Sequence, residues 1–517
     1  MVLARAPGAR RLRRRDRARG ERRRAAAVVQ RRLHDRELPP RAEACADRPR
    51  EGVAIVSSLW SGRFDAAPDA QAFQFGASFR IDRRLFEDDV AGSIAWTRAI
   101  AKAGVLSADE ARRIEQALDA MLARGRANPD FVSGDDEDVH SFVERLLVDE
   151  LGDAGRRLHT GRSRNEQVSL DLRLYLRRRI PLLQRAIAAV VEALAAQAAS
   201  AGRALMPAFT HFRPAQPVLV AHFFLSHAAP LRRDFARFDA ARAEADALPL
   251  GSGAIAGTAY AIDVDMLARD LGFSRIVDNS IDASSDRDFA ATFLYACALT
   301  MVHLSRLAED LVILCGDEHR FFELSDALST GSSMMPQKKN PDPLELVRGK
   351  SGRVIGHLLG LLTTIKGLPT GYNKDLQEDK EAVFGAEDTM AGSLAVVRSV
   401  VDGLTLDRER TAAAASGLLL ATDVADYLVG RGVPFRRAHE IVGALVRKLV
   451  ADRRDFGSLS LAEWRDASDR FDPDVVDRVT PGASVAAKRT PQSTAPAAVD
   501  ARLAEVRRWL DDLGKLC

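Results

Sequence analysis

The sequence predicts a mainly α-helical protein whose centre is a bundle of long helices. Alanine, leucine and arginine dominate its 517 residues and only 6% are aromatic, a composition that favours helices over sheets. Several long stretches repeat apolar side chains every three or four positions, the spacing of one helix face. No alternating run is long enough for a large sheet, and no repeat of about 20–50 residues is present.

The first helices are expected before residue 165. Residues 99–122 carry apolar side chains at helical spacing. Ser107, followed by a glutamate at residue 110, marks a helix start inside this stretch, because this pair can form a capping box. A much longer helix is expected after Asn165. Pro181 falls inside it and is expected to kink the helix or divide it in two.

Three more long helices are expected over residues 286–315, 341–366 and 377–404. In the first of them, the apolar residues from Phe289 to Cys315 follow steps of three and four almost throughout. Helices of more than about 25 residues exceed the width of a small domain. They therefore imply a long bundle, which other subunits could complete.

Four segments are expected along the chain: a basic extension over 1–52, an N-terminal helical domain over 53–163, the central bundle over 164–412 and a C-terminal helical domain over 413–517. Residues 1–50 hold 17 Arg against 6 Asp or Glu, a local charge of +11, so the rest of the chain carries −8 within a total of +3. The extension has almost no aromatic or β-branched residues and is predicted to be disordered. A nucleic-acid arm and a targeting peptide are the alternatives, whereas a secretory signal lacks its apolar stretch.

Several classes of protein lack support. The four cysteines are scattered without a Cys-x-x-Cys pair, which argues against a disulfide scaffold, a structural zinc site and a thioredoxin-like centre. No run of 18 apolar residues predicts a membrane span. The mildly acidic body does not suggest a nucleic-acid surface, and a cytoplasmic protein is expected. Signatures of serine hydrolases, P-loop proteins, dinucleotide-binding folds and zinc proteases are absent from the sequence.

A metal site is not expected either. Glu137, Asp138 and His140 could in principle bind a metal ion, but no second histidine or glutamate cluster accompanies them in the sequence. Neither a metal nor another cofactor is therefore predicted. The chemistry should be acid–base work by side chains on an anionic substrate.

Four polar segments interrupt the helical pattern, and two of them suggest anion binding. In residues 330–341, Asn340 is expected to cap a helix that begins at Pro341, with Lys338 nearby, so that the helix start and the lysine could hold an anion. In residues 158–165, Arg164 could clamp a carboxylate with two hydrogen bonds. A solvated loop and a charged helix start are the structural alternatives.

The other two segments suggest proton transfer and mixed polar contacts. In residues 209–217 the prolines predict extended chain with His211 held within it, and a histidine can give or take a proton near neutral pH, although a lone histidine is more often structural. Residues 370–381 combine tyrosine, asparagine, glutamine and lysine donors with acidic groups. That composition suits a ligand with both carboxylates and a cation, and it equally suits an exposed helix start.

These segments resemble a known family. Residues 331–341 resemble the signature loop of the fumarase/aspartase superfamily, and the Gln-Lys-Lys-Asn form at 337–340, together with 159–165 and 373–381, is similar to the argininosuccinate lyase family. The resemblance covers about residues 58–510. Further matching segments are 59–64, 248–257 and 279–289. It implies three largely helical domains, a homotetramer with a twenty-helix core, and active sites that each draw on three subunits.

The resemblance also implies the reaction and its catalytic residues. The reaction is the reversible cleavage of argininosuccinate into arginine and fumarate, in which a proton leaves the carbon beside a carboxylate and a C–N bond then breaks. Ser332 matches the base, and His211 the group that protonates the leaving nitrogen. Glu345 matches the carboxylate that pairs with this histidine, and its alternative is a pair with Arg348 on the same helix. Lys338 matches a residue that stabilises the carboxylate charge. The residues alone would not have singled out Ser332 from Ser333, Lys338 or His211.

Substrate contacts follow from the same resemblance. They are Ser78, Asp138, Ser163, Arg164, Asn165, Thr210, Asn340, Tyr372, Gln377 and Lys380. The departures are few: Glu166 stands where the family usually has Asp, and Ser61 where it has Gly. Thr258 and Ala259 replace a common Asn-Pro. An active enzyme is expected; another fumarate-releasing lyase and an inactive, crystallin-like homologue are the alternatives, and RNA binding through the basic extension is a third.

Overall fold

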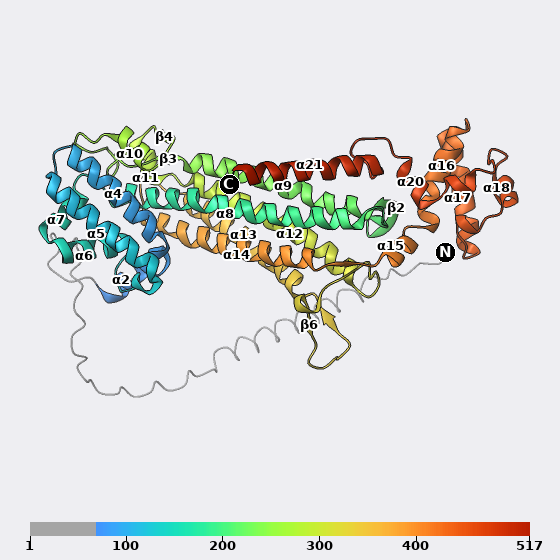
Figure 1. The fold of residues 1–517 in the computed structure, drawn as a ribbon, viewed down its shortest axis with the longest axis horizontal. Helices are drawn as coiled ribbons and strands as arrows, with labels where there is room; N and C mark the ends of the chain where they lie inside the picture. The colour runs from blue at the N-terminus through green and yellow to red at the C-terminus, as the bar shows by residue number, and fades with distance from the viewer. Residues whose placement is uncertain (1–68, 517) are drawn as a thin grey trace, which may run out of the picture. The chain divides into compact units, whose positions relative to one another are not determined.

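The computed structural model describes residues 69–516 (Figure 1). The predicted basic extension over 1–52 and the matching segment 59–64 lie outside the described residues. The first described part is helical. Its helices are α2 (Ala70–Gly76), α3 (Phe79–Asp82), α4 (Phe86–Lys102), α5 (Ala108–Ala127), α6 (Val139–Leu151) and α7 (Asp153–Arg156).

The helix start at Ser107 is confirmed. Its hydroxyl accepts a hydrogen bond from the backbone N–H of Glu110, and the Glu110 carboxylate in return accepts from the N–H of Ser107 at 2.9 Å. The capping box satisfies N–H groups that have no partner within the helix. It separates α4 from α5, which pack against each other.

Five long helices make the bundle and run side by side in Figure 1. They are α8 (Arg164–Ala201), α9 (Val220–Ala245), α12 (Asp288–Cys315), α13 (Asp342–Ile365) and α14 (Asp379–Asp402). α8 packs against α9 and α14, and α12 packs against α9, α13 and α14. The four predicted long helices are confirmed, and the mainly helical class with them. α9 was not predicted as a long helix, and Pro230 lies inside it.

Two local expectations differ from the structure. Of the two outcomes expected at Pro181, division of the helix is wrong, because α8 continues through this residue and has 38 residues in all. Asn340 does not cap α13. The helix begins at Asp342 with Pro341 in the cap position, while Asn340 lies in a short strand and donates to the Thr330 hydroxyl at 3.4 Å.

The strands among the described residues form four two-stranded sheets. The pairs are β1 (Leu205–Thr210) with β2 (Arg213–Leu219), β3 (Ala247–Leu248) with β4 (Arg275–Ile276), β5 (Phe322–Glu323) with β8 (Thr405–Leu406), and β6 (Thr330–Gly331) with β7 (Lys339–Asn340). The β3–β4 pair is parallel and the others are antiparallel. Two short helices, α10 (Val264–Asp270) and α11 (Ser280–Ser285), lie between β3 and the bundle helix α12 in the chain.

The remaining helices follow the bundle. They are α15 (Arg408–Ala414), α16 (Ala421–Gly430), α17 (Phe435–Ala451), α18 (Leu461–Ala467), α19 (Val475–Arg478), α20 (Pro481–Ala486) and α21 (Pro496–Leu516). Residues between Leu420 and Val479 have a hydrophobic core of their own, with Trp464 and Phe471 inside it. α21 packs against α8 and α9 instead, where the Trp509 ring lies 5.3 Å from that of Phe235.

By length and composition, α8 is the one single helix of the described part that could cross a membrane. A span was not expected from the sequence, which has no uninterrupted apolar run. Half of the apolar stretch of α8 is buried within the protein. α8 therefore has the burial of a core helix in a bundle.

The loop after β3 depends on glycines. Gly253 has φ +58°, and a Cβ atom there would lie 2.4 Å from the carbonyl oxygen of Gly257. Gly257 has φ +85°, but the nearest atom to its Cβ position is 3.7 Å away. Both glycines occupy the left-handed region, and only Gly253 also faces a backbone clash.

Gly253→Ala should therefore destabilise the fold more than Gly257→Ala. We expect a loss of about 2–4 kcal/mol in the free energy of unfolding for Gly253→Ala, from strain plus overpacking, and about 1 kcal/mol for the matched Gly257→Ala. Urea denaturation of the two variants measures the difference. Equal losses would contradict the clash.

Candidate functional site

The structure places the predicted site residues in three groups. The helix-start cluster surrounds the N-terminus of α8, the hairpin turn joins β1 to β2, and the signature loop (residues 330–341) precedes α13. Ser78, Asp138, Ser163, Arg164, Asn165, Tyr372, Gln377 and Lys380 belong to the helix-start cluster. Thr210 and His211 belong to the hairpin turn. Ser332, Lys338 and Asn340 belong to the signature loop, and Glu345 lies just after it in α13.

A capping box fixes the start of α8. The Ser163 hydroxyl accepts from the backbone N–H of Asn165 at 3.3 Å, and the Glu166 carboxylate accepts from the N–H of Ser163 at 3.0 Å. Arg164 and Asn165 therefore lie in the first turn, where N–H groups and the helix dipole favour an anion. The Asn165 side chain also donates to the carbonyl of Ala254 at 3.1 Å, which joins the helix start to the glycine-containing loop.

Arg164 lies among carboxylates. Its guanidinium is 3.6 Å from the carboxylate of Asp138 and 3.6 Å from that of Glu144. Although burial disfavours the charged form, Arg164 and His140 hold the pKa of Asp138 below its usual value. Arg164 and Asp138, both predicted to contact the substrate, are thus neighbours in the fold.

A second guanidinium, that of Arg162, is buried beside this cluster. Burial first, and then the charges of Arg162 and Arg164, lower the pKa of His159 to about 3. His159 is therefore neutral at pH 7 and adds no positive charge. The local field comes from the two arginines, as an anion site requires.

Segment 372–380 closes the cluster from another part of the chain. Gln377 donates to the backbone carbonyl of Gly76 at 3.0 Å, and Lys374 pairs with Glu137 at 3.1 Å. Burial raises the pKa of the Tyr372 phenol. Lys380 is buried, and its ammonium donates to Asp379 at 2.9 Å.

Three residues of this cluster carried no predicted role. Asp82 is buried and accepts from the Ser78 hydroxyl and, at 3.0 Å, from the backbone N–H of Val139. Burial raises the pKa of Asp82. Arg287 and Asp379 form a buried ion pair. Asp82 follows Ser78 by four residues, one helical turn, which is the only sequence signal for it.

The hairpin turn differs from its prediction. The strands on either side are extended, as expected, but His211 (φ 54°) and Phe212 (φ 57°) form a left-handed two-residue turn between Thr210 and Arg213. Two consecutive positive φ angles define the turn type that best joins twisted antiparallel strands. The extended conformation expected at His211 is therefore wrong, and the turn leaves its side chain exposed.

In the signature loop, neighbouring residues of the same type make different contacts. The Ser332 hydroxyl oxygen accepts backbone N–H bonds from Met334 at 3.3 Å and Met335 at 3.0 Å. Lys338 and Lys339 are both exposed, but Lys339 is paired with Asp326 at 2.8 Å. The loop therefore distinguishes Ser332 as the serine with two N–H donors and Lys339 as the lysine in an ion pair.

Glu345 is exposed on α13. It lies 3.8 Å from Arg348 on the same helix, the alternative contact that its spacing suggested. The pairing of Glu345 with His211 stays a prediction.

Within one chain, the helix-start cluster lies far from the other two groups. α8 has 38 residues, about 57 Å at 1.5 Å per residue, with Arg164 at its start and the β1–β2 hairpin after its end. β1 and β2 contact α15 and α20 there, and Figure 1 shows β2 at the end of α8 opposite to α6. α13, about 36 Å long, separates the signature loop from residue 372. One chain alone does not unite the three groups.

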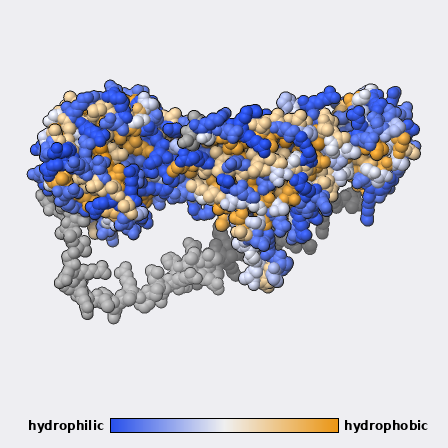
Figure 2. Space-filling model, in the orientation of Figure 1, coloured by the Kyte–Doolittle hydropathy of each residue, from blue (hydrophilic) through white to orange (hydrophobic). Residues whose placement is uncertain are grey.

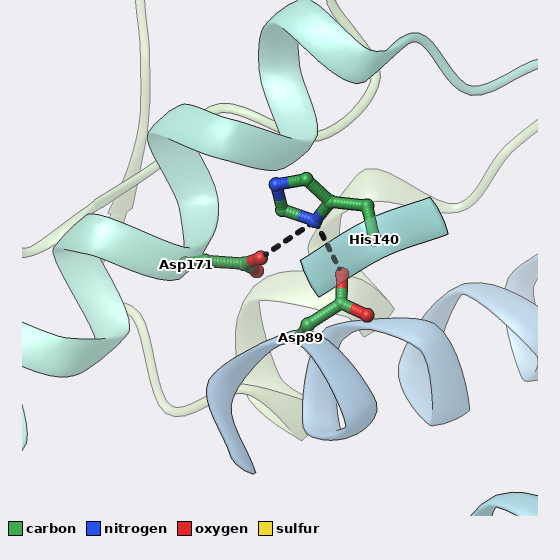
Figure 3. Close-up of side chains that lie close together, drawn as sticks. All are labelled: Asp89, His140 and Asp171. Atoms are coloured by element: carbon green, nitrogen blue, oxygen red, sulfur yellow. Dashed lines mark hydrogen bonds and ion pairs between the residues drawn. The ribbon is translucent and has the colours of Figure 1, made fainter. Parts of the chain in front are cut away.

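A further polar cluster was missed. His140 lies beside Asp89 and Asp171, with one ligand atom of each residue within 4.8 Å of the others (Figure 3). The sequence singled out His140 but offered no second ligand, because its neighbours come from helices 51 and 31 residues away. The chemistry of the three side chains would suit a divalent cation or a hydrogen-bonded network.

A family model described as "Lyase" matches residues 62–356, and one described as "Argininosuccinate lyase C-terminal" matches 418–486. The chain is 47% identical over 454 residues to an argininosuccinate lyase of Roseiflexus sp. (strain RS-1), which covers 88% of this chain and 100% of that protein. It is 46% identical to that of Moorella thermoacetica, over 87% of this chain and 98% of the relative.

Solved structures have the same fold. An EDDS lyase in complex with formate has a TM-score of 0.74 at 25% identity, over 87% of this chain and 93% of that one. A fumarate lyase from Mesorhizobium sp. BNC1 has a TM-score of 0.69 at 20% identity, over 84% and 97%. Fold and matched model define a lyase of the fumarase/aspartase superfamily. Within it, the chain belongs to the argininosuccinate lyase family, and the resemblance inferred from its motifs is confirmed.

Glu166 connects the start of α8 to the glycine-containing loop. Besides capping the helix, its carboxylate accepts backbone N–H bonds from Gly251 at 2.8 Å and Gly253 at 3.0 Å. Burial raises its pKa to about 7 in spite of these donors.

Glu166→Gln should destabilise the protein at about pH 8, where the carboxylate is charged. An amide group has only one acceptor oxygen, so at least one buried N–H would lose its partner, at a cost of about 1–3 kcal/mol. Glu110→Gln is the matched control, because Glu110 has the same place in a capping box but is only partly buried, and its contact with another segment is an ion pair with half-exposed Arg157 instead of buried N–H bonds. Thermal melting of both variants should show the larger fall for Glu166→Gln. A larger fall for Glu110→Gln would refute the connecting role.

Proposed function

We propose that this enzyme cleaves argininosuccinate reversibly into arginine and fumarate by anti β-elimination. The observation that carries the proposal is the signature loop, in which Ser332 receives two backbone N–H bonds beside exposed Lys338. The relatives that match along almost their whole length are argininosuccinate lyases, which supports the same substrate. In this proposal the reaction needs no resident metal or cofactor. It needs only side chains that transfer protons and bind carboxylates.

The chemistry begins with a weakly acidic C–H bond beside a carboxylate. Removing that proton leaves two negative charges on the carboxylate, which positioned donors must stabilise. Ser332 takes the proton. A serine hydroxyl is a poor base, and the N–H groups of Met334 and Met335 favour its alkoxide form. Lys338 and Asn340, at the start of α13, hold the carboxylate.

The C–N bond then breaks, and fumarate forms as the electron pair moves between the two carbons. The C–N electron pair stays on the leaving nitrogen, which takes a proton from His211, so that arginine departs with its guanidinium group restored. Glu345 holds the imidazole in the required orientation. At the helix-start cluster, Arg164, Ser163 and Asn165 bind a substrate carboxylate. The other contacts proposed there are Ser78, Asp138, Tyr372, Gln377 and Lys380, with Thr210 from the hairpin turn.

The active enzyme is proposed to be a homotetramer, because the helix-start cluster lies too far from the other two groups to join them within one chain. α13 supports this arrangement. Its side chains Leu346, Leu359 and Leu362 are exposed, and a Cβ atom added at Gly349, Gly352, Gly356 or Gly360 would meet open space. Such a face can pack closely against another helix. Figure 2 shows apolar surface gathered over the middle of the bundle.

A cytoplasmic location and the predicted domain division belong to the same proposal. A cytoplasmic enzyme agrees with free Cys297 and Cys315. We keep the division into an N-terminal helical domain, a central bundle and a C-terminal helical domain. An inactive, crystallin-like homologue would be expected to lack a catalytic group, and Ser332, His211 and Lys338 are all present.

The activity is tested by following fumarate absorbance with argininosuccinate as substrate. We expect turnover by the wild type and a fall in kcat of about 10²-fold or more in Ser332→Ala and in His211→Asn. Asparagine tolerates the positive φ of the turn, so His211→Asn removes the imidazole but keeps the hairpin. Ser333→Ala is the matched control and should keep near-normal turnover. No fumarate from folded wild type would refute the function; normal rates in Ser332→Ala would refute only the base.

The shared site is tested by mixing inactive variants. If a site takes the hairpin turn from one chain and the signature loop from another, refolding Ser332→Ala together with His211→Asn in equal amounts should leave about one quarter of the sites with both groups intact. Activity should therefore reappear. Ser332→Ala mixed with Lys338→Met should recover none, because both changes lie in the same loop. No recovery in the first mixture would contradict the proposed assembly.

A further inference from the structure

The proposed mechanism makes no use of the buried cluster around His140. His140 lies in the first turn of α6, Asp89 in α4 and Asp171 in α8, and each is at most 1% exposed. The imidazole Nδ1 is 2.8 Å from an oxygen of Asp89 and 3.2 Å from one of Asp171 (Figure 3). Burying two carboxylates and an imidazole is costly, so their retention calls for a role.

Gln167 connects this cluster to the helix start. Its side-chain amide donates to the oxygen of Asp89 that also faces His140, and its carbonyl oxygen accepts from the Arg164 guanidinium at 3.2 Å. Gln167 is 2% exposed. Because one end of the amide must donate and the other accept, its orientation is determined from both sides. A continuous series of contacts thus leads from His140 to Arg164.

The pKa shifts of the two carboxylates agree with this series of contacts. Burial works against a charged Asp89, but His140 and the buried Arg162 hold its pKa below the usual value. Burial and the nearby Asp89 raise the pKa of Asp171. The surroundings thus favour the charged form at Asp89 and disfavour it at Asp171. Asp89 is the carboxylate that accepts from Gln167 and lies against His140.

The Asp89–His140–Asp171 cluster is, we propose, a positioning unit for Arg164: it holds Gln167, and Gln167 orients the guanidinium that receives the substrate carboxylate. This inference rests on the proposed function of Arg164. The cluster contacts no reacting atom in this scheme. It sets the direction of a binding group in the first turn of α8.

A cation site is the competing explanation. His140 Nε2 and both oxygens of Asp171 have no hydrogen-bond partner among the described residues. However, Nδ1 already lies within hydrogen-bond distance of Asp89, and the guanidinium of Arg162 supplies the compensating positive charge. We therefore favour the hydrogen-bonded unit.

The first test compares two substitutions on one helix. Gln167→Leu removes the connection. Gln184→Leu is its matched control, because Gln184 is also buried in α8 and also donates to a carboxylate, that of Asp239, at 2.7 Å, but it lies 17 residues away. We expect Gln167→Leu to raise KM for argininosuccinate by roughly 10-fold or more with kcat within about three-fold of wild type, the pattern of lost binding. Gln184→Leu should change neither constant.

The second test uses the histidine itself. The amide of asparagine can place a donor near the position of Nδ1, so His140→Asn should keep KM close to that of wild type, whereas His140→Leu should raise KM as Gln167→Leu does. Circular dichroism checks that each variant folds. A KM that is equally high in both variants would contradict the positioning role, since only the donor distinguishes them.

A third arm separates the remaining outcomes. Dialysis of the wild type against a chelator should leave KM and kcat unchanged. Loss of activity that Mn²⁺ or Zn²⁺ restores would overturn the inference in favour of a cation site. Wild type that folds but releases no fumarate would refute the proposed function, whereas active wild type with an unaltered KM in Gln167→Leu would refute the positioning unit alone.

Discussion

The length of the bundle helices is the constraint on which the rest of the structure depends. α8 places the arginines of its first turn about 57 Å from its last residue, beyond which the hairpin with His211 begins. The signature loop lies at the start of another long helix, α13. Helices of this length are stiff, so the separation is a fixed property of the chain. Any centre that uses all three groups needs more than one copy.

Within one chain, the start of α8 is where buried charge is concentrated. Arg162 is buried, and Arg164 lies beside it, so opposite charges have to come from neighbouring elements. Asp89 of α4 and Asp138, which caps α6, provide them. The same contacts that stabilise the fold therefore orient the arginines. A substrate carboxylate would add one more negative charge beside the two arginines.

Elements with a strong local signal followed from the sequence, whereas α9 and the irregular elements did not. The apolar spacing of α12 and the capping box at Ser107 depend on neighbours within a few residues, and both were predicted. The cap expected at Asn340 was wrong because a strand pair with Thr330 competes for it. The positive φ of His211 comes from the strand pairing on both sides, which no local pattern of prolines reveals.

By itself, the sequence determined the helical class, the long bundle and the family, because periodicity and motif spacing are local properties that survive without coordinates. It also supplied the candidate residues. Only the tertiary structure decided which serine of the loop receives two N–H bonds and which lysine forms an ion pair. It alone brought Asp89 and Asp171 to His140 and linked them through Gln167 to Arg164. Such contacts join helices distant along the chain, and their pairing depends on how the whole bundle packs.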